Sequence, residues 1–312
     1  MRLLFLFIIA IPLKCFSQID STYIGFYDLR LGIKGFIGRD FVFLNQETAG
    51  QKEVTYMPNN PAKIGAGFSV NNSVISFGYG YGFDFLRDKE KGKTEALDFQ
   101  YHNYGRKFVL DLYIQEYKGF YTEDNPDKKN LKLYPDMKIN QYGLYGHYVF
   151  NNKRFSYRAA FSQSERQLKS TGSFLLGGGI YYTYIKSDSS FLYNNKRTFR
   201  RYQIGVSGGY AYTWVLGRHW LLSASGTLGI NVGSEKLDMT KKIEVHPSVF
   251  PRFAAIYTNK LWAINFSYIN NLLFNPISED DVITVSSGSF QLSFSKRFHL
   301  PDKKIFKIFD LF

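Results

Sequence analysis

The sequence predicts an all-β fold: a closed antiparallel transmembrane β-barrel of about 12 strands, with long external loops and short periplasmic turns. Three observations support this prediction. The chain opens with an export signal, strand-length segments alternate bulky apolar residues with small or polar ones, and the composition includes 30 Phe, 24 Tyr and 27 Gly but only 9 Pro. Aromatic residues and Gly favour strands and tight turns, whereas helices favour Ala, Leu, Glu and Lys.

Residues 1–17 form a predicted signal peptide. Arg2 precedes an apolar run from Leu3 to Leu13, and small residues lie near Ser17, after which we expect cleavage. The run is shorter than the ~20 residues that a membrane-spanning helix needs, so an uncleaved anchor is disfavoured. We therefore expect Sec export, a mature barrel over residues 18–298 and a location in the outer membrane.

The only cysteine, Cys15, lies inside this predicted leader. A lipoprotein anchor is disfavoured because Lys14 stands directly before it, where a small residue is required. The mature chain would then lack thiols, which excludes disulfides, thiolate catalysis and cysteine-ligated metal.

The formal net charge of +13 falls to +11 when Arg2 and Lys14 leave with the leader. For an exported protein, this excess predicts outer-membrane lipid and lipopolysaccharide phosphates as partners, and no nucleic acid.

Period-two alternation defines the expected strands. Phe108 and Leu110, for example, face away from Val109 and Asp111. The six clearest segments are residues 75–85, 107–117, 200–214, 220–232, 262–268 and 282–298.

Such alternation fits a soluble sandwich as well as a membrane barrel. Three features favour the membrane barrel. The segments are mostly about ten residues or longer, as tilted membrane strands require, whereas soluble strands average about five or six. Tyr and Trp gather on the apolar faces near strand ends, as in interfacial girdles, and the opposite faces are rich in Gly, Ser and Thr.

The connections alternate in length, which gives the barrel an orientation because periplasmic turns are short and external loops are long. The predicted short turns are 71–72, 105–106, 151–153, 217–218 and 259–260. The predicted long loops are 46–60, 87–93, 118–137, 187–198, 234–245 and 272–281.

One stretch breaks the pattern. Counting every candidate gives an odd number of strands, and the orientation fails between residues 154 and 186. Both faults disappear if this stretch crosses the membrane once, which leaves about 12 strands, with roughly 10 or 14 as alternatives. Residues 162–173 are then an irregular segment folded against or into the lumen. The terminal strand would be recognised by the barrel-assembly machinery, and residues 299–312 would form a short periplasmic tail.

Several motifs carry a family resemblance. They are YMPNN at 56–60, YKGFY at 117–121, NKRFSYRAAF at 152–161 and SERQLKS at 164–170. With them the chain resembles an uncharacterised domain-of-unknown-function family of Gram-negative bacteria, whose members carry signal peptides and are outer-membrane β-barrel-like proteins. The resemblance covers nearly the whole mature chain and implies location and architecture. It assigns no activity and no functional residues.

Two groups of polar residues are candidate sites. Asp98, His102 and Asp111 are expected to face the lumen together, either as an acid–base cluster or, in the favoured interpretation, as a hydrogen-bonded brace.

The second group lies in the irregular stretch. Ser162, Ser164, Glu165 and Arg166 contain possible nucleophiles, but no histidine is paired with them by spacing. Arg158 and Arg166 could instead form an electropositive constriction that selects anions.

No histidine has metal-ligand spacing, and we expect no cofactor and no metal. The leading functional hypothesis is a non-enzymatic barrel that serves as a narrow pore or as a surface and anchoring protein. The alternatives are a barrel-embedded hydrolase acting on lipid or peptide, and a soluble periplasmic β-protein. A Ser or Asp within hydrogen-bond reach of a His near the rim would favour the hydrolase.

Overall fold

The computed structural model describes residues 19–29, 31–70, 73–79, 87–123, 131–188, 196–235, 244–278 and 280–299. The predicted signal peptide, the predicted turn at 71–72, residues 80–85 of the first alternating segment and the tail beyond residue 299 lie outside these ranges. Within them, no helix is long and apolar enough to cross a membrane.

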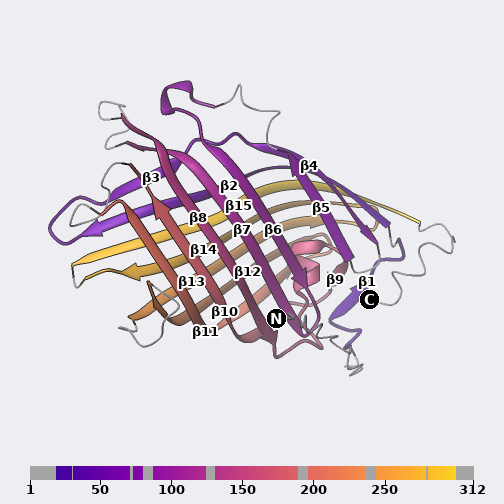
Figure 1. Cartoon of the computed structure of the whole chain (residues 1–312). Coiled ribbons are helices and arrows are strands. Elements are labelled where there is room, and N and C mark those ends of the chain that lie inside the picture. The colour runs from indigo at the N-terminus through magenta and orange to yellow at the C-terminus, as the bar shows by residue number, and fades with distance from the viewer. Residues whose placement is uncertain are drawn as a thin grey trace, which may run out of the picture.

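Strands dominate the described chain (Figure 1). They are β1 (Ile24–Phe26), β2 (Leu31–Thr48), β3 (Val54–Pro58), β4 (Lys63–Val70), β5 (Ser73–Tyr79), β6 (Glu95–Tyr104), β7 (Phe108–Glu123), β8 (Leu131–Val149), β9 (Glu165–Gln167), β10 (Thr171–Lys186), β11 (Thr198–Leu216), β12 (Trp220–Ser234), β13 (Glu244–Thr258), β14 (Trp262–Pro276) and β15 (Asp281–Phe298). The helical turns are η2 (Lys89–Lys91), of 3-10 type, and η3 (Arg158–Ser162), of π type.

The sheet closes on itself between its first and last long strands. β2 and β15 pair antiparallel along their whole length, from Leu31 opposite Phe298 to Thr48 opposite Asp281. From β15 the hydrogen-bonded path runs through β14, β13, β12, β11, β10, β8, β7 and β3 back to β2. Ten strands therefore form a closed ring.

Two more strands, β5 and β6, lie beside this ring. β3 and β4 are successive parts of one crossing, because both pair with β2, β3 near Leu44 and β4 along residues 31–38. β4 pairs onward with β5, and β6 pairs with β7. The ring of 10 together with β5 and β6 makes 12 strands, which confirms the predicted fold class.

The connections separate two ends of the barrel. We call the end that carries the tight turns after β6, β11 and β13 the turn end, and the opposite end, where β2 finishes and β15 begins, the loop end. By the rule for such barrels the turn end is periplasmic. The loops predicted at 46–60, 118–137 and 272–281 were too long, because strands β3, β7, β8 and β14 continue into them. These strand ends are polar because they extend beyond the apolar zone, and polar stretches were expected to be loops.

The outer face of the wall is apolar. Val206 and Leu228 are each 68% exposed, and Phe174 is 69% exposed, although all three are large apolar residues. At alternate positions the inward side chains include buried polar groups such as Asp111 and Gln141. A soluble sandwich would show the reverse distribution, so this wall is built to face lipid.

Buried inward side chains form three apolar clusters, which we call layers, along the length of the barrel. The loop-end layer consists of Val42, Leu44, Tyr56, Tyr117, Phe120, Tyr134, Met137, Ile139, Ile185, Phe199, Ile283 and Val285. The middle layer consists of Tyr113, Tyr145, Tyr181, Phe250 and Leu273. The turn-end layer consists of Val109, Val149, Phe155, Tyr157, Ala160, Phe161, Leu175, Ala211, Leu221, Ala254 and Ile256.

The turn-end layer includes a segment that is not part of the wall. In the stretch 155–167, η3 contacts β6, β12 and β13. Phe161 within η3 and Phe155 just before it pack against the inner side of the barrel. β9 then pairs with β1, with Ile24 opposite Gln167, outside the main sheet. We call residues 155–167 together with β1 the plug.

The plug confirms that residues 154–186 cross the membrane only once, through β10. Its position differs from the predicted irregular segment at 162–173. The irregular part starts earlier, and residues 171–173 already belong to β10. The reason for the error is that Phe155, Tyr157 and Phe161 alternate as in a strand, yet bury themselves in the plug.

A close approach across β10 depends on Gly177. This residue lies directly opposite His147 on β8 and Ser207 on β11. Because Gly177 has no side chain, His147 Nε2 and Ser207 Oγ meet over it at 3.0 Å. A Cβ atom at residue 177 would lie 1.9 Å from the carbonyl oxygen of Gly146.

We therefore expect Gly177→Ala to destabilise the barrel by about 1–3 kcal/mol through overpacking. The measurement is the urea midpoint of the refolded protein, followed by its heat-modifiable mobility on gels. Gly226→Ala is the matched control, because no atom lies within 4 Å of the added Cβ. Equal midpoints for the two variants would contradict the packing argument.

Candidate functional site

The predicted cluster of Asp98, His102 and Asp111 lies on β6 and β7, facing the interior. His102 stands directly opposite Asp111 in the strand register, and its Nδ1 lies 2.5 Å from Asp111 Oδ1. The second carboxylate oxygen accepts a hydrogen bond from Arg252 Nη2 on β13 at 2.7 Å. Since Asp111 is 1% exposed, these two partners compensate a charge that is removed from water.

Arg252 extends this contact across the lumen. Its guanidinium also donates to the hydroxyl of Tyr145 on β8 and lies 5.5 Å from the centre of that ring. The Tyr145 hydroxyl in turn donates to Asn271 Oδ1 on β14 at 3.1 Å. The chain of contacts therefore joins β6 and β7 to the opposite wall.

Asp98 belongs to a neighbouring group. Its carboxylate accepts hydrogen bonds from Gln100 and Gln115, both at 2.8 Å, and from the Tyr117 hydroxyl at 2.7 Å. The structure thus brings His102 and Asp111 into contact, while Asp98 binds its own three donors. Every one of these groups has a partner that holds it in place, which is the arrangement of a brace.

The second predicted group lies in the plug. Glu165 is 1% exposed and accepts hydrogen bonds from Arg106 at 2.5 Å, Arg158 at 3.4 Å and Ser156 Oγ at 2.6 Å. Arg106 belongs to the turn between β6 and β7. The carboxylate of Glu165 therefore fastens the plug to the wall.

The remaining members of this group do not converge on a histidine. Ser162 Oγ donates to the carbonyl oxygen of Arg158 at 3.1 Å and lies 3.0 Å from Ser164 Oγ. Arg166 lies 5.9 Å from the ring of Tyr27, on the opposite face of β9 from Glu165. Arg158 and Arg166 therefore do not form one open basic patch.

Sequence reasoning did not identify Arg252 or the pair of His147 and Ser207. Residues 244–258 were not among the six clearest segments, because β13 contains two prolines. A signal was nevertheless present: Arg252 is a single cation between the inward apolar residues Phe250 and Ala254. A lone charge on an apolar face indicates a buried partner.

The His147–Ser207 contact is a histidine–serine pair, but it lies in the interior and not at the rim. Each residue is 5% exposed, and Tyr145 packs edge-on against the imidazole. Among the described residues, no group of three His, Cys, Asp or Glu side chains could hold a metal ion.

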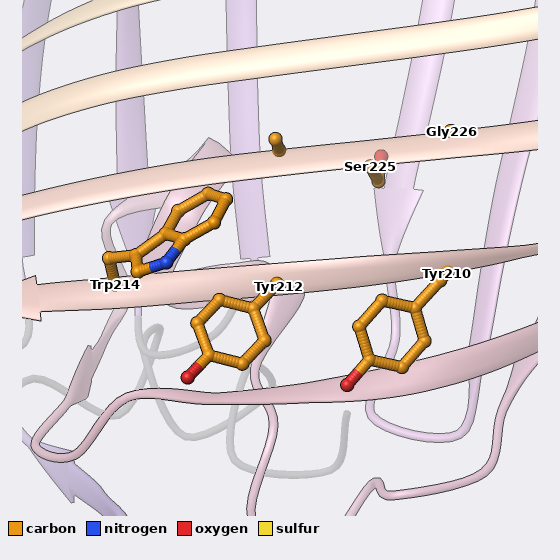
Figure 2. Close-up of a pocket in the computed structure, with 6 residues that line it drawn as sticks. Tyr210, Tyr212, Trp214, Ser225 and Gly226 are labelled. Carbon is orange, nitrogen blue, oxygen red and sulfur yellow. The ribbon is translucent and has the colours of Figure 1, made fainter.

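Two hollows open on the outer surface. Figure 2 shows the first, an apolar groove of about 450 Å³ between Tyr210, Tyr212 and Trp214 of β11 and the small residues of β12. Its outward aromatic lining fits contact with lipid chains. A second hollow near the loop end, of about 250 Å³, is lined by the cations Arg39, Arg87 and Lys91 among others.

The cations of this second hollow are already engaged. Arg39 Nη2 donates to the carbonyl oxygen of Pro58 at 3.4 Å, and Arg87 donates to a carbonyl of its own loop. Lys91 Nζ donates to Glu123 Oε2 at 2.6 Å, and this hydrogen bond raises the pKa of Lys91. Each of these three cations therefore already has a hydrogen-bond acceptor within the protein.

Comparison with known proteins gives a family and a general likeness. The model of DUF4421, a domain of unknown function, matches residues 18–298. No curated protein matches the chain. Among solved structures, the outer membrane protease OmpT of Escherichia coli has 7% identity and a TM-score of 0.33, covering 86% of this chain and 97% of that one. A bacterial polysaccharide outer membrane secretin has 9% identity and a TM-score of 0.31, covering 90% and 100%. The toluene transporter TodX of P. putida has 7% identity and a TM-score of 0.24, covering 87% and 91%.

The contact between Arg252 and Asp111, which we call the brace, leads to a testable prediction. Arg252→Met leaves the Asp111 carboxylate buried without its cation, so we expect a destabilisation of about 3–5 kcal/mol in urea unfolding. Arg218→Met, at an exposed turn between β11 and β12, is the control and should change stability by less than about 0.5 kcal/mol.

Adding Asp111→Asn to Arg252→Met removes the orphaned charge and should restore part of the lost stability. If Arg252→Met unfolds like the wild type, the brace has no stabilising role.

Proposed function

The chain belongs to DUF4421, a family named only as a domain of unknown function, and we propose a function from the structure of its lumen. The protein is a non-conducting barrel that anchors itself in the outer membrane and presents its loop end at the cell surface. The observation that supports this is the succession of three buried apolar layers inside the barrel. The Sec pathway would deliver the chain, and the barrel-assembly machinery would insert it, as expected from the sequence.

The loop-end layer is the strongest argument against an open pore. Met137 and Ile139 on β8 and Ile185 on β10 are all 0% exposed. They face Leu44 and Ile283 within the same cluster. Water and ions crossing here would have to displace packed apolar side chains, which disfavours a constitutive channel.

A polar layer lies directly below it. Gln115, Gln141 and Thr183 stand opposite one another on β7, β8 and β10, and each is buried. Several of their polar atoms have no protein partner, including both side-chain polar atoms of Gln141. Such atoms are suited to bind enclosed water molecules. Apolar layers on both sides keep this polar layer from becoming a continuous aqueous path.

The hydrolase hypothesis is supported only by the contact between His147 and Ser207. That pair lies between Tyr145 of the middle layer and Val149 of the turn-end layer. Each of the two residues is only 5% exposed, so the geometry favours a structural hydrogen bond. The non-enzymatic interpretation is therefore the one we propose.

We expect the purified, reconstituted protein to show no stable conductance in planar bilayers and no swelling of liposomes with small sugars. A porin with an open lumen, reconstituted in the same way, is the positive control. Reproducible single-channel steps from the wild-type protein would refute the proposal, because a filled lumen cannot carry them.

Single-cysteine labelling tests the filling directly, because the mature chain is expected to lack cysteine. Met137→Cys should resist a charged maleimide in the folded barrel, since residue 137 is 0% exposed. Glu53→Cys, at an exposed position in the turn after β2, should react at least about tenfold faster. Comparable rates at the two positions would show that water reaches the loop-end layer.

A further inference from the structure

Three lysines form a row on the outer face near the loop end. Lys118 of β7 lies directly opposite Lys138 of β8, which lies directly opposite Lys186 of β10. All three are exposed, and the neighbouring Tyr117, Ile139 and Ile185 are buried inward. The lysine side chains therefore project outward side by side from three adjacent strands.

This arrangement is unfavourable for the protein alone. Like charges that stand directly opposite one another on neighbouring strands repel. Within the part of the chain that the structure describes, none of these three lysines forms an ion pair with the protein. Glu95 of β6 stands opposite Lys118 at one end of the row. Asp136 of β8 also interacts electrostatically with Lys118, so these five positions carry a net charge of +1. Lys138 and Lys186 have no acidic residue opposite them in the register.

The row has a defined height above the lipid-facing zone. Four residues towards the turn end, Tyr142 and Tyr182 occupy the same face, with ring centres 5.9 Å apart. Tyr202 continues this aromatic row, 4.5 Å from Tyr182. Below it the outward residues are apolar, with Leu144 and Ile180 exposed.

The outer face thus changes from apolar to tyrosine to lysine along the same strands. Tyrosine marks the membrane–water interface, so the lysines stand at the level of lipid phosphates. Because the turn end is periplasmic, this is the outer leaflet. Arg200, which lies 5.3 Å from the ring of Tyr184 beside the row, adds a further cation at this level.

We propose that Lys118, Lys138 and Lys186 bind the phosphorylated headgroup of an outer-leaflet lipid of the lipid A class. Adjacent strands are about 4.8 Å apart, so the three strands span roughly 10 Å, which one sugar-phosphate headgroup can cover. Its acyl chains would lie along the apolar face below, beside Leu144 and Ile180. The phosphates supply counter-charge to Lys138 and Lys186, which have no acidic residue opposite them in the register. The site rests on the membrane placement of the proposed function and not on the closed lumen.

The test compares lipids that differ only in phosphate. Detergent-purified, full-length mature protein is titrated with bis-phosphorylated lipid A, with the same lipid after phosphate removal, and with inorganic phosphate, and bound lipid is counted by native mass spectrometry. We expect the first to bind at least tenfold more tightly than the second, and inorganic phosphate not to compete at equal concentration. Equal binding of the two lipids, or full competition by free phosphate, would overturn the proposal.

A charge-matched pair of variants locates the site. The triple variant Lys118→Gln, Lys138→Gln, Lys186→Gln should lose about a hundredfold in affinity, because each lysine near a membrane surface contributes roughly one kcal/mol. Lys107→Gln, Lys153→Gln, Lys260→Gln removes the same charge from turns at the other end and should bind like the wild type. Heat-modifiable mobility shows that both variants fold. Equal affinity of the two triple variants would overturn the assignment, and bilayer conductance, measured separately, reports on the closed lumen alone.

Discussion

The pairing of β2 with β15 is the contact on which the rest of the structure depends. A sheet in lipid cannot leave an edge, because each unpaired backbone group there costs several kcal/mol. The two strands meet in register over all 18 residues of each, from Leu31 with Phe298 to Thr48 with Asp281. Closure turns one face of every strand inward. The inward faces enclose a small lumen, which either side chains or water must occupy.

Filling this volume explains the residue types that stand inside. Inward glycines stand next to inward tyrosines: a Cβ at Gly143 would lie 2.2 Å from the ring of Tyr113, so the missing side chain makes room for the aromatic one. Charges are admitted only with partners, as Asp111 shows with His102 and Arg252. The same rule accounts for Glu165 in the plug. Burial with partners explains these carboxylates without a catalytic role.

Much of this architecture could be predicted from the sequence, because alternation reports directly on the two faces of a strand. The segments 200–214 and 282–298 lie within β11 and β15, and the strand count followed from requiring an even number. Contacts between distant strands could not be predicted. The partner of Asp111 is 141 positions away on β13, and a pattern within one strand does not contain the register that joins them. The plug could not be predicted for a different reason. Its apolar residues have the spacing of a strand, but they do not pair with a neighbouring strand of the main sheet.

The perimeter of the barrel explains why the plug lies where it does. Near the loop end β3 pairs with both β2 and β7, whereas towards the turn end β2 pairs with β4 and β7 pairs with β6. The added strands widen this end, and wall side chains of ordinary size cannot fill a wider lumen. Phe155 and Phe161 supply the missing apolar volume, and Arg297 Nη2 holds the plug by donating to the carbonyl oxygen of Gln163 at 3.2 Å. Two further apolar layers lie above the plug. With the closed lumen proposed above, we infer that the plug acts as a packing element of the wide end and not as a gate.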